Sequence, residues 1–299
     1  MAATILRFGL LLTILASTVS CATPQSTTIP TPASSSFPTP KNPIAELEKS
    51  MVFAPTRFPE GNWKPAGLAF EDAWFKAADG TKLHGWYCPH EKPKAVVLFC
   101  HGNAGNLSDR AGVVRLLHDR IGISVMIFDY RGYGRSEGQP SEAGILQDAQ
   151  AARRWLAKRA GVDEGDVVLM GRSLGGGVAV DLAAADGARG LVLESTFTSL
   201  PDVAGKLMPW VPAKLLMQTR LNSLAKIGNY RGPLLQSHGD ADRLIPYEFG
   251  QRLFANANQP KTFVRIPGGD HNDPQTAEYY RALEKFLTEL PEFKPKDAS

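Results

Sequence analysis

The chain has 299 residues, of which 43% are hydrophobic and 21% charged, so it can bury a sizeable core and is not disordered as a whole. Its formal net charge is only +3, and the basic residues are scattered among acids, which gives no indication of a nucleic-acid partner. At this length we expect one large domain and a tail.

The first 21 residues have the pattern of an export signal. Arg7 precedes the apolar run FGLLLTILA, and small residues follow up to Cys21. The run is too short for a confident membrane span. The placement of Cys21 is similar to the lipobox of bacterial lipoproteins, although Thr18 stands where leucine is usual. We therefore predict a cell-envelope lipoprotein held on a membrane through Cys21. Ordinary cleavage with secretion or periplasmic release, and an uncleaved anchor, remain the alternatives.

The next segment, residues 22–45, is rich in threonine, serine and proline and is typical of an extended linker. A domain at residues 46–292 and a short C-terminal tail at residues 293–299 complete the predicted organisation. Beyond Cys21 the chain has only Cys88 and Cys100, which allow at most one disulfide.

Apolar runs alternate with helical patterns from about residue 68. A hairpin is predicted for EDAWFKAADGTKLHGWYCP, at the edge of the sheet. Continuously apolar strands indicate a sheet covered on both faces. The runs, most of which are continuously apolar, are AVVLFC, SVMIFDY, DVVLMG, GLVLES, PLLQSHG and TFVRIPG. The segments EAGILQDAQAARRWLAKRAG and PYEFGQRLFANA fit crossover helices, and Asp273 and Pro274 are predicted to start the last helix. We predict an α/β fold with a mostly parallel, doubly wound sheet and an antiparallel N-terminal hairpin.

Residues 197–232 interrupt this alternation with irregularly spaced apolar residues and three prolines. The pattern predicts a short helical excursion over one end of the sheet, too short to be a large cap domain. Such an excursion can serve as a small lid or acyl-binding wall. It can equally be a packed connection with no role in substrate binding.

Polar residues follow the apolar strands, where a doubly wound sheet binds its ligands. In GRSLG, residues 171–175, a strand turns abruptly into a helix, and glycines two before and two after Ser173 remove side chains that would collide there. The hydroxyl of Ser173 would then stand at a helix N-terminus, which favours developing negative charge. Alternatively, Ser173 is only a small residue tolerated at a tight crossing. The order Ser, then Asp, then His on later strand ends favours a nucleophile.

Six motifs in this order resemble the serine-hydrolase branch of the α/β-hydrolase superfamily over about residues 68–290. They are FCHGNAGNL, FDYRGYGRSEG, GRSLGGGVA, ESTFTSL, HGDADRLIP and GGDHND, and they are similar to those of its small capless group, which includes protein depalmitoylases. The resemblance implies the α/β-hydrolase fold and hydrolysis of esters or thioesters. It also implies that Ser173 is the nucleophile, His271 the general base and then acid, and Asp242 the carboxylate that orients the imidazole. The backbone N–H groups of Asn103 and Leu174 would form the oxyanion hole.

Several neighbours compete for these roles. Asp240 is the rival of Asp242, but the family's pattern puts the acid at the fifth position of HGDAD, which leaves Asp240 as a turn residue. His101 and His238 sit in His-Gly turns, where histidine can hold loop geometry by hydrogen bonding. Asp129 and Arg131 either touch substrate or belong to a rigid supporting loop.

No cofactor or metal is predicted, because the histidines and acids do not cluster at ligand spacing and no dinucleotide-binding glycine pattern follows AVVLFC. The predicted function is hydrolysis of a small-molecule or lipid-like acyl substrate. A peptidase or amidase of the same fold, or a non-catalytic binding protein on this scaffold, are the alternatives. Relatives with dehalogenase or epoxide-hydrolase chemistry have aspartate at the position of Ser173, so these two activities are disfavoured.

Overall fold

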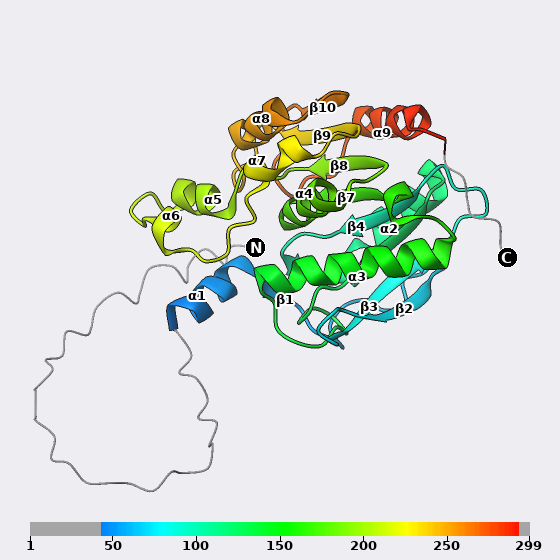
Figure 1. The fold of residues 1–299 in the computed structure, drawn as a ribbon, viewed down its shortest axis with the longest axis horizontal. Helices are drawn as coiled ribbons and strands as arrows, with labels where there is room; N and C mark the ends of the chain where they lie inside the picture. Colours follow the sequence, from blue (N-terminus) through cyan, green and yellow to red (C-terminus); the bar gives the residue numbers. More distant parts are fainter. Residues whose placement is uncertain (1–42, 293–299) are drawn as a thin grey trace, which may run out of the picture. The chain divides into compact units, whose positions relative to one another are not determined.

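The structure is a computed structural model that describes residues 43–292. The predicted signal sequence, Cys21, most of the predicted linker and the C-terminal tail lie outside these residues. Within them, eight strands form one sheet with helices on both faces (Figure 1). No helix among residues 43–292 combines the length and the hydropathy needed to cross a bilayer.

The sheet is mostly parallel, with the order β10-β9-β8-β7-β4-β6-β3-β2. Its parallel strands are β10 (Lys261–Ile266), β9 (Leu234–Gly239), β8 (Gly190–Glu194), β7 (Val168–Arg172), β4 (Val96–Cys100) and β6 (Ser124–Phe128). β3 (Lys82–Cys88) runs antiparallel to β6, and β2 (Glu71–Lys76) runs antiparallel to β3 at the edge. The predicted doubly wound sheet and its N-terminal hairpin are therefore confirmed.

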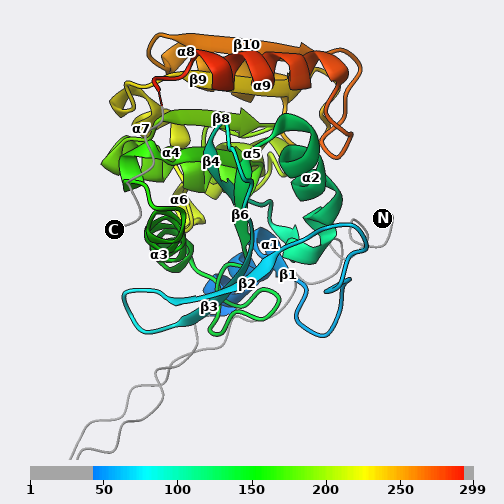
Figure 2. The same ribbon diagram turned by 90° about the vertical axis from the view of Figure 1, so that its right-hand side faces the viewer.

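Both faces of the sheet are buried, because alternate residues of each strand enter different cores. Leu98 packs in one core and Val97 in the other. The first core is covered by α3 (Glu142–Ala160), α4 (Leu174–Asp186) and α8 (Tyr247–Asn256). The second is covered by α2 (Ala111–Leu116) and α9 (Ala277–Glu289). Figure 2 shows α3 and α2 on opposite sides of the sheet.

Short elements complete the described residues. β1 (Ala54–Pro55) pairs in parallel with β5 (Ala104–Gly105). Three 3₁₀ turns span Leu107–Arg110, Glu164–Asp166 and Ile227–Asn229, and a π turn at Leu117–Ile121 continues α2. Cys88 and Cys100 are both buried and free, so these two cysteines do not form the disulfide that the sequence allowed. Burial raises the pKa of each thiol to about 12.

The last helix begins later than predicted. α9 starts at Ala277, and the N-cap is Thr276, whose hydroxyl accepts a hydrogen bond from the backbone N–H of Tyr279. The prediction of an N-cap at Asp273 is wrong. Its carboxylate instead accepts from the backbone N–H of Asp270 at 2.8 Å, which closes the turn that carries His271.

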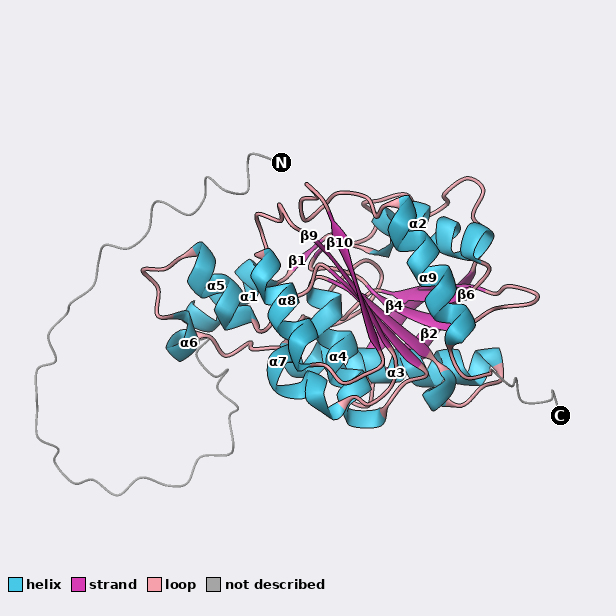
Figure 3. Ribbon diagram, turned by 90° about the horizontal axis from the view of Figure 1, so that it is seen from above, coloured by secondary structure: helices cyan, strands magenta, loops and turns pink. Residues whose placement is uncertain are grey.

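The excursion at residues 197–232 is helical, as predicted, and the described residues contain no large cap domain. It holds α5 (Leu200–Leu207), α6 (Ala213–Leu216) and α7 (Ser223–Lys226). Helix α1 (Pro43–Val52) is fastened to it, because the Glu48 carboxylate accepts hydrogen bonds from the backbone N–H groups of Gln218 and Thr219 at 2.9 and 2.6 Å. Figure 3 shows α1, α5 and α6 grouped at one end of the domain.

Candidate active site

Ser173 occupies the sharp turn between β7 and α4. Its backbone has φ 55° and ψ −120°, a left-handed region that a residue with a side chain rarely adopts. The turn is tight enough that a Cβ on Gly171 would collide with the carbonyl of Gly175, and one on Gly175 would collide with the carbonyl of Cys100. The two glycines therefore permit the close backbone approach that pushes Ser173 out at the sheet edge, as the sequence predicted.

The structure brings Ser173, His271 and Asp242 together from three distant loops. Nε2 of His271 lies 3.1 Å from Oγ of Ser173, and Nδ1 lies 2.8 Å from Oδ2 of Asp242. All three residues are buried, with exposed fractions between 6% and 8%. An ionised carboxylate can only accept, so Nδ1 carries a proton and Nε2 is free to accept the serine hydroxyl proton. This is the arrangement needed to activate a serine as a nucleophile.

Asp242 is held as an ionised acceptor. Its Oδ1 accepts from the backbone N–H groups of Leu244 and Ile245 at 2.9 and 2.7 Å, and His238 Nε2 lies 3.3 Å from its Oδ2. Burial alone would raise the pKa of Asp242, but the hydrogen bonds from His238, His271 and the Ile245 backbone outweigh it and hold the pKa well below its usual range.

Asp240, the alternative candidate for the orienting acid, does not contact His271. Its carboxylate accepts from the Nε of Arg265 and from the backbone N–H of Gly268, each at 2.6 Å. These hydrogen bonds tie the turn after β9 to the turn after β10. The structure thus places Asp242, and not Asp240, beside His271.

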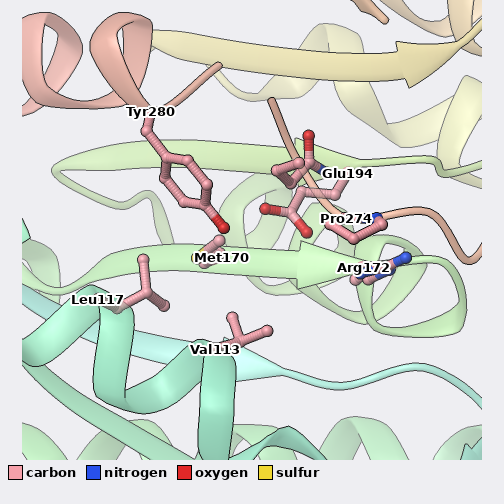
Figure 4. Close-up of a pocket in the computed structure, with 8 residues that line it drawn as sticks. Val113, Leu117, Met170, Arg172, Glu194, Pro274 and Tyr280 are labelled. Atoms are coloured by element: carbon pink, nitrogen blue, oxygen red, sulfur yellow. The ribbon is translucent and has the colours of Figure 1, made fainter. Parts of the chain in front are cut away.

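Arg172 holds the loop that carries His271. Its guanidinium donates to the carbonyl oxygen of His271 at 2.9 Å, and Glu194 lies beside it on the neighbouring strand. Burial raises the pKa of Glu194, which accepts a hydrogen bond of 2.6 Å from the hydroxyl of Tyr279. Arg172 and Glu194 line a cavity of about 60 Å³, together with apolar side chains that include Met170 (Figure 4). Ser173 is not among the residues that line this cavity.

The loop that bears Asn103 lies against Ser173. A Cβ on Gly102 would come 3.6 Å from the Cβ of Ser173. The carbonyl oxygen of Asn103 accepts from the hydroxyl of Tyr133 at 2.7 Å and from the backbone N–H of Ala54 at 3.1 Å. These hydrogen bonds fix this loop beside the turn that carries Ser173, and Leu174 directly follows Ser173 in the chain.

The segment FDYRGYGRS is a support and not an exposed binding loop. Tyr130 and Tyr133 are fully buried, and the Tyr130 hydroxyl donates to the carbonyl of His101 at 3.0 Å. Asp129 is also fully buried and accepts from the backbone N–H of Leu107. Arg131 forms a bidentate ion pair with Asp148 of α3. The sequence raised this supporting role as one of two readings, and the hydroxyl contacts of the two tyrosines favour it.

The two histidines in His-Gly turns also have structural partners. His101 Nδ1 lies 2.7 Å from the carbonyl oxygen of Gly102, and His238 Nε2 lies 2.9 Å from that of Ile245. Both side chains are fully buried. Within residues 43–292, no group of three or more histidine, cysteine, aspartate or glutamate side chains is arranged to hold a metal ion.

Comparisons with known proteins show which family the chain is similar to. A family model described as "Serine aminopeptidase, S33" (Hydrolase_4) matches residues 91–228. The chain is 38% identical over 251 residues to the uncharacterized protein Rv2307c of Mycobacterium tuberculosis, an alignment that covers 82% of this chain and 89% of that protein. It is 35% identical over 247 residues to the alpha/beta hydrolase domain-containing protein WAV2 of Arabidopsis thaliana, covering 76% of this chain and 78% of WAV2.

The fold also has a solved counterpart. The Pyrococcus furiosus esterase Pf2001 superposes with a TM-score of 0.66 and 21% sequence identity, covering 80% of this chain and 98% of the esterase. At this level of identity the likeness concerns the fold. It agrees with the mostly parallel sheet described above.

Proposed function

Because the chain belongs to the α/β-hydrolase superfamily, we propose that it is a serine hydrolase that cleaves carboxylic esters or acyl thioesters through an acyl-enzyme on Ser173. The observation that carries this proposal is the hydrogen-bonded series from Ser173 through His271 to Asp242. The esterase activity named for Pf2001 supports an ester as the bond that is cleaved.

In this mechanism Oγ of Ser173 attacks the substrate's carbonyl carbon while Nε2 of His271 takes the hydroxyl proton. The backbone N–H groups of Asn103 and Leu174 stabilise the negative charge on the carbonyl oxygen. The imidazolium then returns its proton to the departing alcohol or thiol as the C–O or C–S bond breaks. A water molecule, deprotonated by the same imidazole, hydrolyses the acyl-serine to the free acid and restores the hydroxyl.

A peptidase or amidase is the second candidate, and the description of the matching family favours it. An aminopeptidase has to hold a positively charged substrate amine, usually with a carboxylate. Two acids beside the site in sequence are already paired: Asp240 with Arg265, and Asp270 with Arg243. These pairs favour an acyl substrate without that amine.

A panel of substrates separates the two candidates. We expect the purified chain to hydrolyse p-nitrophenyl esters and acyl thioesters of graded chain length, and to leave amino-acid p-nitroanilides almost untouched. The reasons are that an alcohol or thiol leaves more readily than an amine, and that the carboxylates of Asp240 and Asp270 beside the site are already paired with arginines. The measurement is kcat/KM for each substrate. A higher kcat/KM for the anilides would identify a peptidase.

We also propose that the chain is exported and carries a lipid on Cys21, on the evidence of the N-terminal sequence alone. Cells grown with a clickable fatty-acid analogue should label the wild-type chain, and Cys21→Ser should abolish the label, because the thiol is the only point of attachment proposed. The measurement is in-gel fluorescence of the purified chain. An unlabelled wild-type chain in the soluble fraction would indicate a secreted enzyme without an anchor.

A further inference from the structure

We propose that Asp270 is a positioning residue whose carboxylate keeps the imidazole of His271 within hydrogen-bonding distance of Asp242. This role rests on the hydrolase function proposed above, because Asp270 acts through the base of that mechanism. Asp270 directly precedes His271 in the chain, and Arg243 directly follows Asp242. Asp270 and Arg243 are therefore the neighbours of the base and the acid, and they contact each other.

One carboxylate oxygen of Asp270 joins the loops of the acid and the base through their backbones. Oδ1 accepts from the backbone N–H of His271 at 2.8 Å and from the backbone N–H of Arg243 at 3.0 Å. An ionised acceptor makes such hydrogen bonds stronger than a neutral one does. Because both bonds end on one atom, neither loop can move away from the other without breaking one of them. We call this contact the Oδ1 bridge.

The second oxygen, Oδ2, accepts from the guanidinium of Arg243, with Nε at 2.8 Å. The Arg243 side chain is 87% exposed and that of Asp270 28%, and exposed ion pairs contribute little because water and salt screen them. The guanidinium still helps to keep Asp270 ionised: its hydrogen bond, with those of the two backbone N–H groups, lowers the pKa of Asp270 to about 2. The positioning therefore falls to the Oδ1 bridge, and the guanidinium supports it.

The base residue is held at both of its backbone polar groups. Its N–H donates to Asp270, and its carbonyl oxygen accepts from Arg172. Arg172 is the last residue of β7, directly before Ser173, whereas Arg243 belongs to the loop of the acid. Arg172 thus ties His271 to the strand of the nucleophile, and Asp270 ties it to the loop of the acid.

The reaction requires that two contacts of the imidazole hold at once. Nδ1 lies 2.8 Å from Asp242, and Nε2 lies 3.1 Å from Ser173. The acid and the base follow the neighbouring strands β9 and β10, so a shift of one loop against the other changes the first distance. A misplacement of about 1 Å can lower the rate by about 10²-fold. The nucleophile and the proposed oxyanion donors follow other strands, β4 and β7, so loss of the Oδ1 bridge should lower kcat and leave KM nearly unchanged.

Asp240 offers a matched control, because it joins the same two loops by the same kinds of contact. Its carboxylate accepts from the backbone N–H of Gly268 and from the guanidinium of Arg265, each at 2.6 Å. These partners include neither His271 nor the residue after Asp242. Asp240→Ala therefore removes a carboxylate–arginine pair and a backbone hydrogen bond between the loops and leaves the Oδ1 bridge in place.

The test is kcat and KM for a p-nitrophenyl ester with purified variants of the full chain. Asp270→Ala should lower kcat by roughly 10- to 100-fold, with KM changed by less than about threefold. Arg243→Ala should lower kcat by about threefold at most, since it removes only the exposed ion pair and keeps the backbone N–H. Asp240→Ala should have the kcat of wild type. Circular dichroism of each variant checks that the fold is kept.

Two further variants separate the Oδ1 bridge from the charge of Asp270. Asp270→Asn removes the charge, but its amide oxygen can take the place of Oδ1 and accept from both backbone N–H groups. Asp270→Glu keeps the charge and carries its oxygens one methylene farther out. We expect Asp270→Asn to keep more of kcat than Asp270→Glu. This comparison does not depend on whether Asp270→Ala folds, and the reverse order would overturn the proposal.

Proton NMR gives a readout that does not depend on turnover. The Nδ1 proton of His271, hydrogen-bonded to Asp242, should give a downfield resonance that His271→Ala lacks. It should broaden or disappear in Asp270→Ala and persist in Asp240→Ala. The same result from a chain that cleaves no ester or thioester would refute the proposed function and still support the positioning role. Equal losses of kcat in Asp270→Ala and Asp240→Ala would contradict the role, as would a raised KM at unchanged kcat in Asp270→Ala.

Discussion

Ser173→Ala is expected to lower the turnover of short-chain p-nitrophenyl esters and thioesters by about 10⁴-fold or more. The substitution removes the Oγ that lies 3.1 Å from His271 and leaves no other atom to form the acyl-enzyme. The fold should survive, because the change deletes a single atom and alanine can occupy the same turn beside Gly171 and Gly175. The measurement is kcat with purified protein, together with labelling by a fluorophosphonate probe.

Ser237→Ala is the matched control for this prediction. Ser237 is also buried near the carboxyl edge of the sheet, on β9, and its hydroxyl has no hydrogen-bond partner. Its loss should leave turnover and probe labelling as in wild type. Labelling of wild type and Ser237→Ala, but not of Ser173→Ala, would also exclude a non-catalytic binding protein on this scaffold. Undiminished turnover by pure Ser173→Ala would refute the assignment of the nucleophile.

The central strands could be predicted from the sequence because a strand buried on both faces has a continuous run of apolar residues. VVLFC is apolar throughout and SVMIF is apolar after Ser124, and both become parallel strands in the middle of the sheet. The hairpin could also be predicted, since an Asp-Gly turn separates two strands. The first residue of α9 could not be predicted from the sequence. Both Asp273 and Thr276 suit an N-cap, and the choice depends on the turn around His271, which no local pattern reveals.

In the candidate site, too, some residues could be predicted from the sequence and others could not. The roles of Ser173, Asp242 and His271 could be predicted from their residue types, from the spacing of the glycines and from their positions after strands. Their supporting residues could not be predicted, because each acts on a partner that is remote in the chain. Arg172 reaches the carbonyl of His271, and Tyr133 reaches that of Asn103. Such contacts are products of the sheet order, which brings the ends of β4, β6, β7 and β10 to one edge. The only sequence signal for them is the polar character of the strand ends.

Asp242→Asn is expected to lower kcat by about 10⁴-fold while the fold stays intact. The backbone N–H groups of Leu244 and Ile245 donate to Oδ1, so the amide oxygen of an asparagine must take that position. The amide NH₂ then faces Nδ1 of His271 in place of Oδ2. The imidazole can pair with it only by carrying its proton on Nε2, which turns a donor toward Ser173 where an acceptor is required.

The pH profile of kcat/KM and a neighbouring variant check this reasoning. Hydrogen bonds hold the pKa of Asp242 well below its usual range, so the carboxylate stays ionised while activity falls at acid pH. Only the base then takes up a proton, and the acid limb of the wild type should have the slope of one ionisation. Asp240→Asn should keep most of the activity, because that carboxylate pairs with Arg265 and does not contact the imidazole. If Asp240→Asn lost more activity than Asp242→Asn, the orienting carboxylate would have to be Asp240, reached through a rearranged turn after β9.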